Sequence, residues 1–211
     1  MPIQAFIVDF YDVLYCEKDS VSLQVFEQRH NLPEGGLRQA MSRSKYFRDA
    51  RLGRVDGETL WRDVAQHIGT SPEEWRTLVS LSESAFGLNE DLVAFFERLH
   101  PYYKMALLSN ATPHVRHLVT QQFHLSHLFD VMVISAEEGV KKPDPESYER
   151  TLQRLQVPAA ETIFVDDDQD YVATAQALGM YGVAFHTTKQ AMTDIDKLLQ
   201  SNEREISPQN T

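Results

Sequence analysis

The sequence predicts an α/β fold in which a doubly wound parallel sheet carries an inserted helical segment. Short apolar runs rich in β-branched and aromatic residues recur along the chain, and they lack the polar alternation of a half-exposed strand. Helix start signals follow the later runs, so strand and helix alternate, which is typical of a parallel sheet with helices on both faces. Residues 15–88 interrupt this alternation with helical periodicity and almost no strand pattern.

Five apolar runs are the candidates for buried strands. Each carries β-branched or aromatic residues, and none alternates polar with apolar positions, as expected for strands that are covered on both faces. The runs are residues 3–10 (IQAFIVDF), 104–110 (KMALLSN), 131–135 (VMVIS), 162–167 (TIFVDD) and 182–186 (GVAFH).

The helices between the later strands begin at recognisable signals. Thr112-Pro113 and Asp144-Pro145 each place a proline before apolar residues at helical spacing. A third helix follows the fourth predicted strand. We expect Asp168 and Asp170 to cap its N-terminus and Gly179 to end it.

The interrupting segment is predicted to be a helical cap domain. Ser20, Asp56 and the run Ser71-Pro72-Glu73-Glu74 each predict the start of a helix. Because the segment follows the first strand directly, we expect it to lie over the carboxyl edge of the sheet. Trp61 and Trp75 are expected to pack in its core. The predicted division is a core domain of residues 1–14 and 89–200, a cap domain of residues 15–88 and a polar tail of residues 201–211.

The composition excludes several classes of protein. Among 211 residues, Lys and Arg number 20 and Asp and Glu number 31, so the formal net charge is 20 − 31 = −11. Such a surface repels nucleic acid and anionic membranes, and no apolar run approaches the ~20 residues of a membrane span. The single cysteine, Cys16, cannot form an internal disulfide, and no signal-peptide pattern opens the chain. We therefore expect a cytoplasmic protein.

Polar side chains stand where three of the predicted strands end. Asp9 ends the first strand, Ser109 ends the second, and Asp166 and Asp167 end the fourth, so all four are expected at the ligand-binding edge of the sheet. Two carboxylates ~4 Å apart repel by roughly 4 kcal/mol at an effective dielectric of 20. A cation must offset this repulsion. Mg²⁺ fits an Asp-only site better than zinc or iron does, and Lys142 is a second candidate counter-charge.

These residues make the chain resemble the haloacid dehalogenase (HAD) superfamily of aspartate-nucleophile hydrolases, in the branch with a helical cap after the first motif. The four motifs occur in the family's order as VDFYDVL, LLSN, GVKKPDPESY and FVDDDQDYV, and the segment from Gly139 to Gly182 is especially similar to sugar-phosphate phosphatases. The resemblance implies a Rossmann-like core with Asp9 as nucleophile. The implied phosphate-binding residues are Ser109, Asn110 and Lys142, and the implied Mg²⁺ ligands are Asp9, the Tyr11 carbonyl, Asp166 and Asp167.

The resemblance further implies a Mg²⁺-dependent phosphatase that acts on a small phosphorylated metabolite through an aspartyl-phosphate. Most phosphatases of the superfamily carry a second aspartate two residues after the nucleophile, as general acid and base. Here that position is Tyr11, which we expect to contact the substrate. Asp12 follows it, and in an extended stretch its side chain would point to the opposite side. Turnover is therefore expected to be slow, or to rely on another proton donor.

Two other functions stay open at this point. With a tyrosine two residues after the nucleophile, the chain also resembles the 2-haloacid dehalogenases, whose aspartate displaces halide from carbon without a metal. Arg29 is the nearest candidate for their substrate-binding arginine. The acidic run from Asp166 to Asp168 favours the metal-dependent reaction. The second alternative is a non-catalytic binding protein on the same fold. The sequence names neither the substrate nor the oligomeric state.

Histidines spaced by three residues are a separate feature of the sequence. They are His114, His117, His124 and His127. Because no third type of metal ligand lies nearby in the sequence, we interpret all four as surface residues rather than as a metal site.

Overall fold

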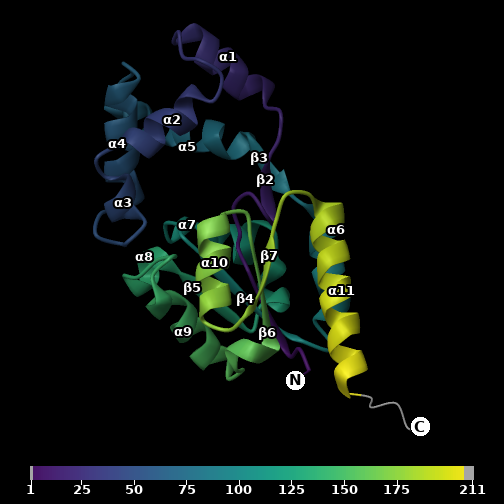
Figure 1. Ribbon diagram of the computed structural model, residues 1–211. Helices are drawn as coiled ribbons and strands as arrows, with labels where there is room; N and C mark the ends of the chain where they lie inside the picture. Colours follow the sequence, from purple (N-terminus) through teal and green to yellow (C-terminus); the bar gives the residue numbers. More distant parts are fainter. Residues whose placement is uncertain (1, 207–211) are drawn as a thin grey trace, which may run out of the picture.

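The computed structural model describes residues 2–206, with side chains described for residues 2–202. Its centre is a five-stranded parallel sheet in the order β5-β4-β1-β6-β7, so the first strand of the chain lies in the middle (Figure 1). The predicted fold class and all five predicted strands are confirmed. The strands are β1 Ala5–Val8, β4 Lys104–Ser109, β5 Val131–Ile134, β6 Thr162–Asp166 and β7 Tyr181–Ala184.

Successive residues of β1 serve opposite faces of the sheet. Phe6 and Val8 join the hydrophobic core on one face, whereas Ala5 and Ile7 join the core on the other. Helices cover both faces, which explains why the strands lack polar alternation. The first face is covered by α6 (Glu90–Leu99) and α11 (Thr188–Ile206), and the second by α9 (Pro145–Leu155) and α10 (Gln169–Ala177) (Figure 1).

The remaining helical segments around the sheet are short. They are α7 (His114–His117), the π-helical turn η2 (Leu118–Gln122), the 3-10 turns η3 (Leu125–Leu128) and η4 (Ala159–Glu161), and α8 (Ser135–Glu138). At the other end of the chain, α11 continues through residues 201–206, where the polar tail was expected to begin, and residues 207–211 lie outside the described residues. No described helix is both long and apolar enough to cross a membrane.

The predicted boundaries of the sheet-covering helices are confirmed. Asp144 accepts a hydrogen bond from the N–H of Glu146 at 3.1 Å and so caps α9. Asp168 caps α10 in the same way. After α10, Gly179 has a φ of +92°, a backbone conformation that side chains disfavour and that suits glycine at a helix end.

The residues from 21 to 84 form five helices with a hydrophobic core of their own, which includes Leu37, Leu60, Val64 and Leu78. In Figure 1 these helices lie beyond the carboxyl ends of the sheet strands. Their bounds are α1 Val21–Arg29, α2 Gly36–Arg43, α3 Phe47–Ala50, α4 Gly57–His67 and α5 Trp75–Ser84, and the 3-10 turn η1 (Pro72–Glu74) precedes α5.

The predicted helix starts in this segment hold with one difference. Ser20 accepts from the N–H of Leu23, and Asp56 accepts from the N–H of Thr59 at 2.7 Å. Ser71, however, accepts from Glu73 rather than from the following residue. The first turn therefore tightens into η1, and the α-helix begins only at Trp75.

Two strands lie in the segment where almost no strand was expected. β2 (Tyr15–Glu17) and β3 (Phe86–Leu88) pair antiparallel at the two points where the chain passes between the sheet and the helical segment. Each strand has three residues, too few for periodicity to show. This two-stranded β2–β3 ribbon holds the incoming and outgoing chain segments together. It therefore fixes the place where the helical segment joins the sheet.

Candidate active site

The carboxyl edge of the sheet brings the predicted site residues together. Asp9 follows β1 directly, and its N–H donates to the Val165 carbonyl at 3.0 Å, so it lies beside the end of β6. Ser109 and Asp166 are the last residues of β4 and β6, the two neighbours of β1. Parallel pairing therefore places side chains from distant parts of the sequence at one edge, as predicted.

Three carboxylates and one ammonium group form the charged centre of the site. One oxygen from each of Asp9, Asp166 and Asp167 lies within 4.8 Å of the others. The fully buried Lys142 places its Nζ 3.0 Å from Asp9 Oδ1 and 2.5 Å from Asp166 Oδ2. Among the described residues, Lys142 is the one cation that forms an ion pair with this group of three acids.

The pKa values of these groups record the excess of negative charge. Burial raises the pKa of Asp166, although Lys142 opposes this, and Asp9 raises it further. Burial and the nearby Asp9 also raise the pKa of Asp167. Burial disfavours the charged form of Lys142, but Asp9 and Asp166 outweigh it and raise the lysine pKa. The site is short of positive charge, and its donors are all carboxylate oxygens, so the residues present fit a hard divalent cation such as Mg²⁺.

The two neighbouring acids differ in what surrounds them. Asp166 is fully buried and both of its oxygens are used, Oδ2 by Lys142 and Oδ1 by the N–H of Asp168 at 2.9 Å. Asp167 is exposed at the edge of the site. Asp166 thus holds the lysine in place, whereas Asp167 keeps its oxygens accessible for a metal ion.

Asn110 positions the lysine through its backbone. Its Oδ1 accepts from the Lys142 N–H at 2.8 Å, and its Nδ2 donates to the Lys142 carbonyl at 2.9 Å and to the Tyr171 hydroxyl at 3.2 Å. Both ends of the amide are therefore engaged. The side chain of Asn110 thus joins the second and third motifs, and the substrate contact expected for this residue stays a prediction.

Ser109 presents a hydroxyl with no hydrogen-bond partner among the described residues. The side chain is 1% exposed and ends the strand beside β1. An unpaired buried hydroxyl costs about 1–3 kcal/mol, so such a group in a site is suited to bind an oxygen of a ligand.

Asp12 does not lie in an extended stretch, and this part of the prediction is wrong. Its φ is +60°, because the chain reverses after Asp9 and the N–H groups of Leu14 and Tyr15 return to the Phe10 carbonyl. The carboxylate of Asp12 lies 2.6 Å from Arg38 on α2. Asp12 therefore binds the helical segment.

Tyr11 faces a cleft between the helical segment and the sheet. Its ring packs against Phe10, Tyr15 and Phe86, with centroids 5.4–5.8 Å apart. Burial raises the pKa of its hydroxyl far above the ordinary value of 10, and Tyr15 and Glu83 add to this. The hydroxyl thus stays protonated at neutral pH and cannot act as a general base.

The cleft contains charged residues that the sequence did not single out. They are Arg38, Arg51 and Glu83, and His114 lines the cleft beside them. His114 is exposed, as expected, and its Nε2 lies 2.5 Å from the Glu83 carboxylate of α5. Arg29, the candidate arginine of the dehalogenase alternative, lies in the last turn of α1 and does not line the cleft. Isolated charges on helices carry no sequence signal that separates cleft residues from surface residues.

The loop after α3 docks the helical segment onto the sheet next to the site. Arg51 Nε donates to the Asn110 carbonyl at 2.7 Å, and the Arg51 carbonyl accepts from the Ser135 hydroxyl at 2.6 Å. Gly53 approaches α8 so closely that a Cβ would lie 2.0 Å from the Ala136 carbonyl oxygen, and its φ is +69°. The close approach and the backbone conformation both require glycine there.

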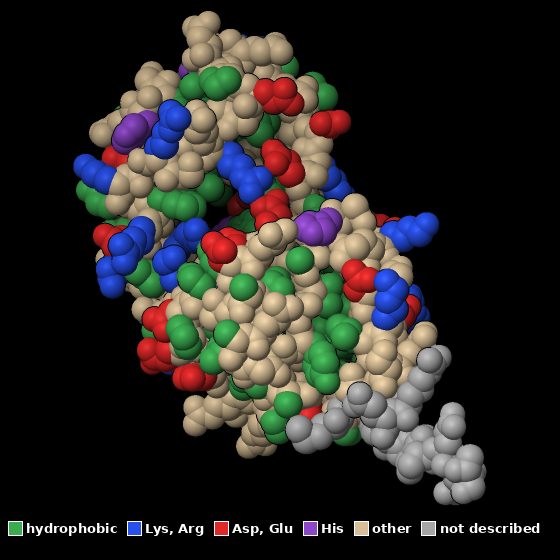
Figure 2. Space-filling model, viewed as in Figure 1, with side chains coloured by type: hydrophobic (Ala, Val, Ile, Leu, Met, Phe, Trp, Pro, Cys, Tyr) green, Lys and Arg blue, Asp and Glu red, His purple; other side chains and the backbone are tan. Residues whose placement is uncertain are grey.

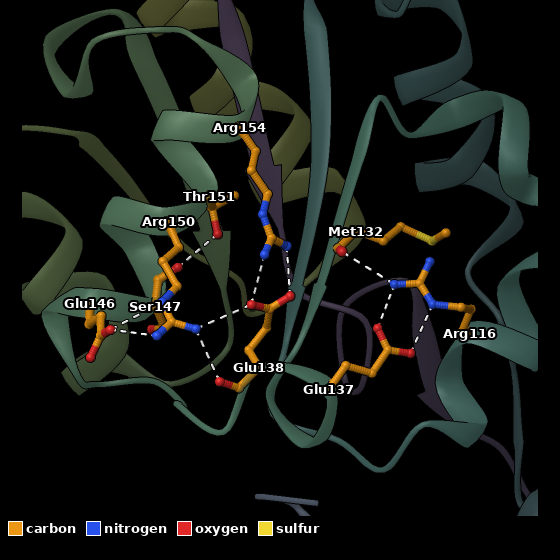
Figure 3. A network of polar contacts seen from close by, with 9 residues as sticks. All are labelled: Arg116, Met132, Glu137, Glu138, Glu146, Ser147, Arg150, Thr151 and Arg154. Carbon is orange, nitrogen blue, oxygen red and sulfur yellow. Dashed lines mark hydrogen bonds and ion pairs between the residues drawn. The ribbon is translucent and has the colours of Figure 1, made fainter.

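A network of ion pairs holds the short helix that precedes Lys142 (Figure 3). Glu138 of α8 binds Arg154 at 2.6 and 2.8 Å and Arg150 at 3.3 Å, and Glu137 pairs with Arg116 at 2.6 Å. Arg154 and Arg150 together hold the pKa of Glu138 below its ordinary value. The network therefore fixes the start of the loop that follows α8 and carries Lys142 into the site.

Glu138→Gln is therefore expected to lower the free energy of unfolding by about 1 kcal/mol near neutral pH. Because the folded-state pKa of Glu138 is depressed, the stabilisation is present above the pKa of an unfolded glutamate, about 4.3, and is lost as the pH falls through the folded-state value. Urea titrations of both proteins at neutral and acidic pH measure the difference. Glu149→Gln, at an exposed position of the neighbouring helix, is the matched control. A Glu138 effect no larger than the control's would show that the network does not stabilise α8.

Comparison with known proteins agrees with the geometry of the site. A family model described as a haloacid dehalogenase-like hydrolase matches residues 3–179. Among curated proteins, the chain is 44% identical over 77 residues to the sesquiterpene phosphatase astK of Aspergillus oryzae, a match that covers 36% of this chain and 38% of that protein. It is 27% identical over 156 residues to the phosphoserine phosphatase of Thermus thermophilus, covering 72% of this chain and 59% of that one. The matches thus span less than two thirds of these two relatives.

A solved structure shares the fold of most of the chain. It is a HAD family enzyme from Bacteroides thetaiotaomicron in complex with magnesium and inorganic phosphate, and it matches with a TM-score of 0.70 over 87% of this chain and 94% of that one. The two sequences are 18% identical. The likeness therefore extends to both the sheet and most of the helical segment.

Proposed function

The chain belongs to the haloacid dehalogenase-like hydrolases, and from this premise we propose that it is a Mg²⁺-dependent phosphomonoesterase that acts on small phosphorylated molecules in the cytoplasm. The observation that carries the proposal is the charge of the site. Three carboxylates lie within 4.8 Å of one another and Lys142 alone contacts two of them, an arrangement suited to a dication and a phosphate. The names of the two phosphatase relatives support the same reaction class.

Asp9 would attack the phosphorus atom and form an aspartyl-phosphate, and the P–O bond to the alcohol would break as its oxygen takes up a proton. Water would then attack the aspartyl-phosphate, which releases inorganic phosphate and returns Asp9 as a free carboxylate. The Lys142 ammonium and the unpaired Ser109 hydroxyl would bind the phosphate oxygens, so that developing charge is met by groups already in place. Asp9, Asp167 and the Tyr11 carbonyl would hold Mg²⁺, with Asp166 orienting Lys142. The metal supplies positive charge that offsets the repulsion between the Asp9 carboxylate and the phosphate dianion.

Proton transfer is the weak point of the proposed reaction. Tyr11 stands where phosphatases of this family carry the aspartate that protonates the leaving group, and Asp12 is paired with Arg38. The two side chains that follow the nucleophile most closely in this loop and carry oxygen are thus a protonated phenol and a carboxylate that is paired with an arginine. We propose that turnover is slow for this reason.

Phosphate release from a panel of phosphate monoesters, with Mg²⁺ and with a chelator, tests reaction class and metal together. We expect release only with Mg²⁺. Asp167→Asn should raise the Mg²⁺ concentration for half-maximal activity by at least about tenfold, since losing even an outer partner of a metal ligand costs that much. Asp170→Asn, at an exposed position of the same acidic run, is the control. Release that persists in chelator would contradict the proposal.

The dehalogenase reaction remains the competing function because of Tyr11. It would need an arginine to bind the carboxylate of the substrate, and Arg51 lines the cleft whereas Arg29 does not. That reaction needs no metal, and it leaves the excess of acidic groups at Asp166 and Asp167 without a purpose. Metal-independent chloride release from a 2-chloro acid, with no phosphate release from the panel, would favour the dehalogenase.

A further inference from the structure

Apolar atoms supply most of the exposed surface of the cleft beside the proposed nucleophile, and polar and charged residues line it as well. Its volume is about 490 Å³, within the ~300–1,000 Å³ of ligand sites. Figure 2 shows the hollow between the upper helical part and the lower sheet part of the molecule. Six aromatic rings line it: Tyr11, Tyr15, Phe47, Trp61, Trp75 and Phe86.

Both tryptophans of the chain lie on this wall. Trp61 also packs against the core of the helical segment, as predicted, but Trp75 is not among the residues of that core and its Nε1 has no partner among the described residues. The prediction that Trp75 anchors the helical core is therefore wrong. A large aromatic surface faces the cleft instead, because α5 presents Trp75 and Val79 to it.

The charged groups of the cleft are already paired with protein atoms. Asp12 binds Arg38, Glu83 binds His114, and Arg51 donates to the Asn110 carbonyl while its guanidinium lies 5.0 Å from the Phe47 ring. Glu58 binds Arg62. A substrate with many hydroxyl groups would need such groups as partners, whereas an apolar substrate needs none of them.

We propose that this cleft takes an apolar tail, so that the preferred substrates are phosphate monoesters of hydrocarbon-like alcohols rather than sugar phosphates. The inference deepens the proposed function and rests on it. The phosphate would lie at Asp9, Ser109 and Lys142, and the tail would extend past Tyr11 among the aromatic rings. Burying the tail supplies binding energy in proportion to its length.

A chain-length series tests the proposal on the unmodified protein. With Mg²⁺ present, kcat/KM is measured for n-butyl, n-hexyl and n-octyl phosphate and for glycerol phosphate. A fully buried methylene contributes up to about a fourfold gain, so we expect n-octyl phosphate to exceed n-butyl phosphate by at least about tenfold. Glycerol phosphate should be the poorest substrate. Equal values for butyl and octyl phosphate, or a preference for glycerol phosphate, would overturn the proposal.

Tryptophan fluorescence separates this inference from the proposed function, because both tryptophans line the cleft and binding needs no turnover. We expect the dissociation constant of n-octyl phosphate to be at least about tenfold below that of n-butyl phosphate. Tighter octyl binding without phosphate release would retain the apolar cleft and refute the phosphatase. Phosphate release with no dependence on chain length in either measurement would retain the phosphatase and refute the apolar cleft.

A charge placed on the cleft wall supplies the variant test. Val79→Asp should lower the ratio of octyl to butyl kcat/KM by about fivefold or more, since the tail would then bury a carboxylate. Val21→Asp is the matched control, because Val21 is 73% exposed on α1. The ratio remains meaningful if overall activity falls. An unchanged ratio in Val79→Asp would show that the tail does not pass this wall.

Discussion

Asp9→Asn is expected to lower kcat/KM for any phosphate monoester by about 10⁴-fold or more, the scale on which removing a covalent nucleophile acts in other hydrolases. An amide oxygen is a poor nucleophile toward phosphorus, and the substitution also removes one of the three negative charges gathered at the site. Initial rates with a sensitive phosphate assay, at saturating Mg²⁺, measure the loss.

The control for this variant is the same substitution at Asp196, which is exposed on α11 on the sheet side of the molecule. Asp196→Asn should retain full activity. Thermal unfolding of both variants should show a folded protein, because the asparagine side chain has nearly the size and shape of the aspartate that it replaces. If Asp9→Asn kept more than a small fraction of the activity, another group would have to be the nucleophile and the proposed chemistry would fail.

The site at the sheet edge could be predicted because parallel pairing constrains it. Asp9, Ser109 and Asp166 each end a short apolar run, and in a parallel sheet such ends meet at one edge whatever the loops between them do. The position of Lys142 cannot be predicted in this way, because Lys142 does not end a strand. Its place depends on Asn110, whose amide holds the lysine backbone by two hydrogen bonds across 32 residues of sequence.

The cleft could not be predicted, because it depends on how two parts of the chain face each other. Asp12 was expected to point away in an extended stretch, but the turn that follows Asp9 directs it to Arg38. Trp75 was expected in a helical core because large aromatics at helical spacing usually pack there. Which side of α5 meets the core is decided by the packing of α1, α4 and the β2–β3 ribbon, and no local pattern encodes this.

Tyr11→Asp is the substitution expected to increase activity. General acid-base catalysis contributes about 10²- to 10⁴-fold, and the residue now at this position has a hydroxyl whose pKa burial raises too far for it to serve as a base. An aspartate there would restore a carboxyl group next to the nucleophile. We expect kcat for phosphate release from an alkyl ester, whose leaving group needs a proton, to rise by about 10²-fold or more. An aryl ester with an acidic leaving group should gain less.

Tyr11→Phe is the matched variant, because it keeps the ring against Phe10, Tyr15 and Phe86 and removes only the hydroxyl. If a missing carboxyl group limits the rate, the phenylalanine variant should resemble the unmodified protein while the aspartate variant is faster on alkyl esters. A large loss in Tyr11→Phe would instead make the phenol itself the proton donor. If neither variant changes the rate, another pair of side chains already transfers the proton to the leaving group. Glu83 and His114, 2.5 Å apart on the same cleft, would then be the groups to replace.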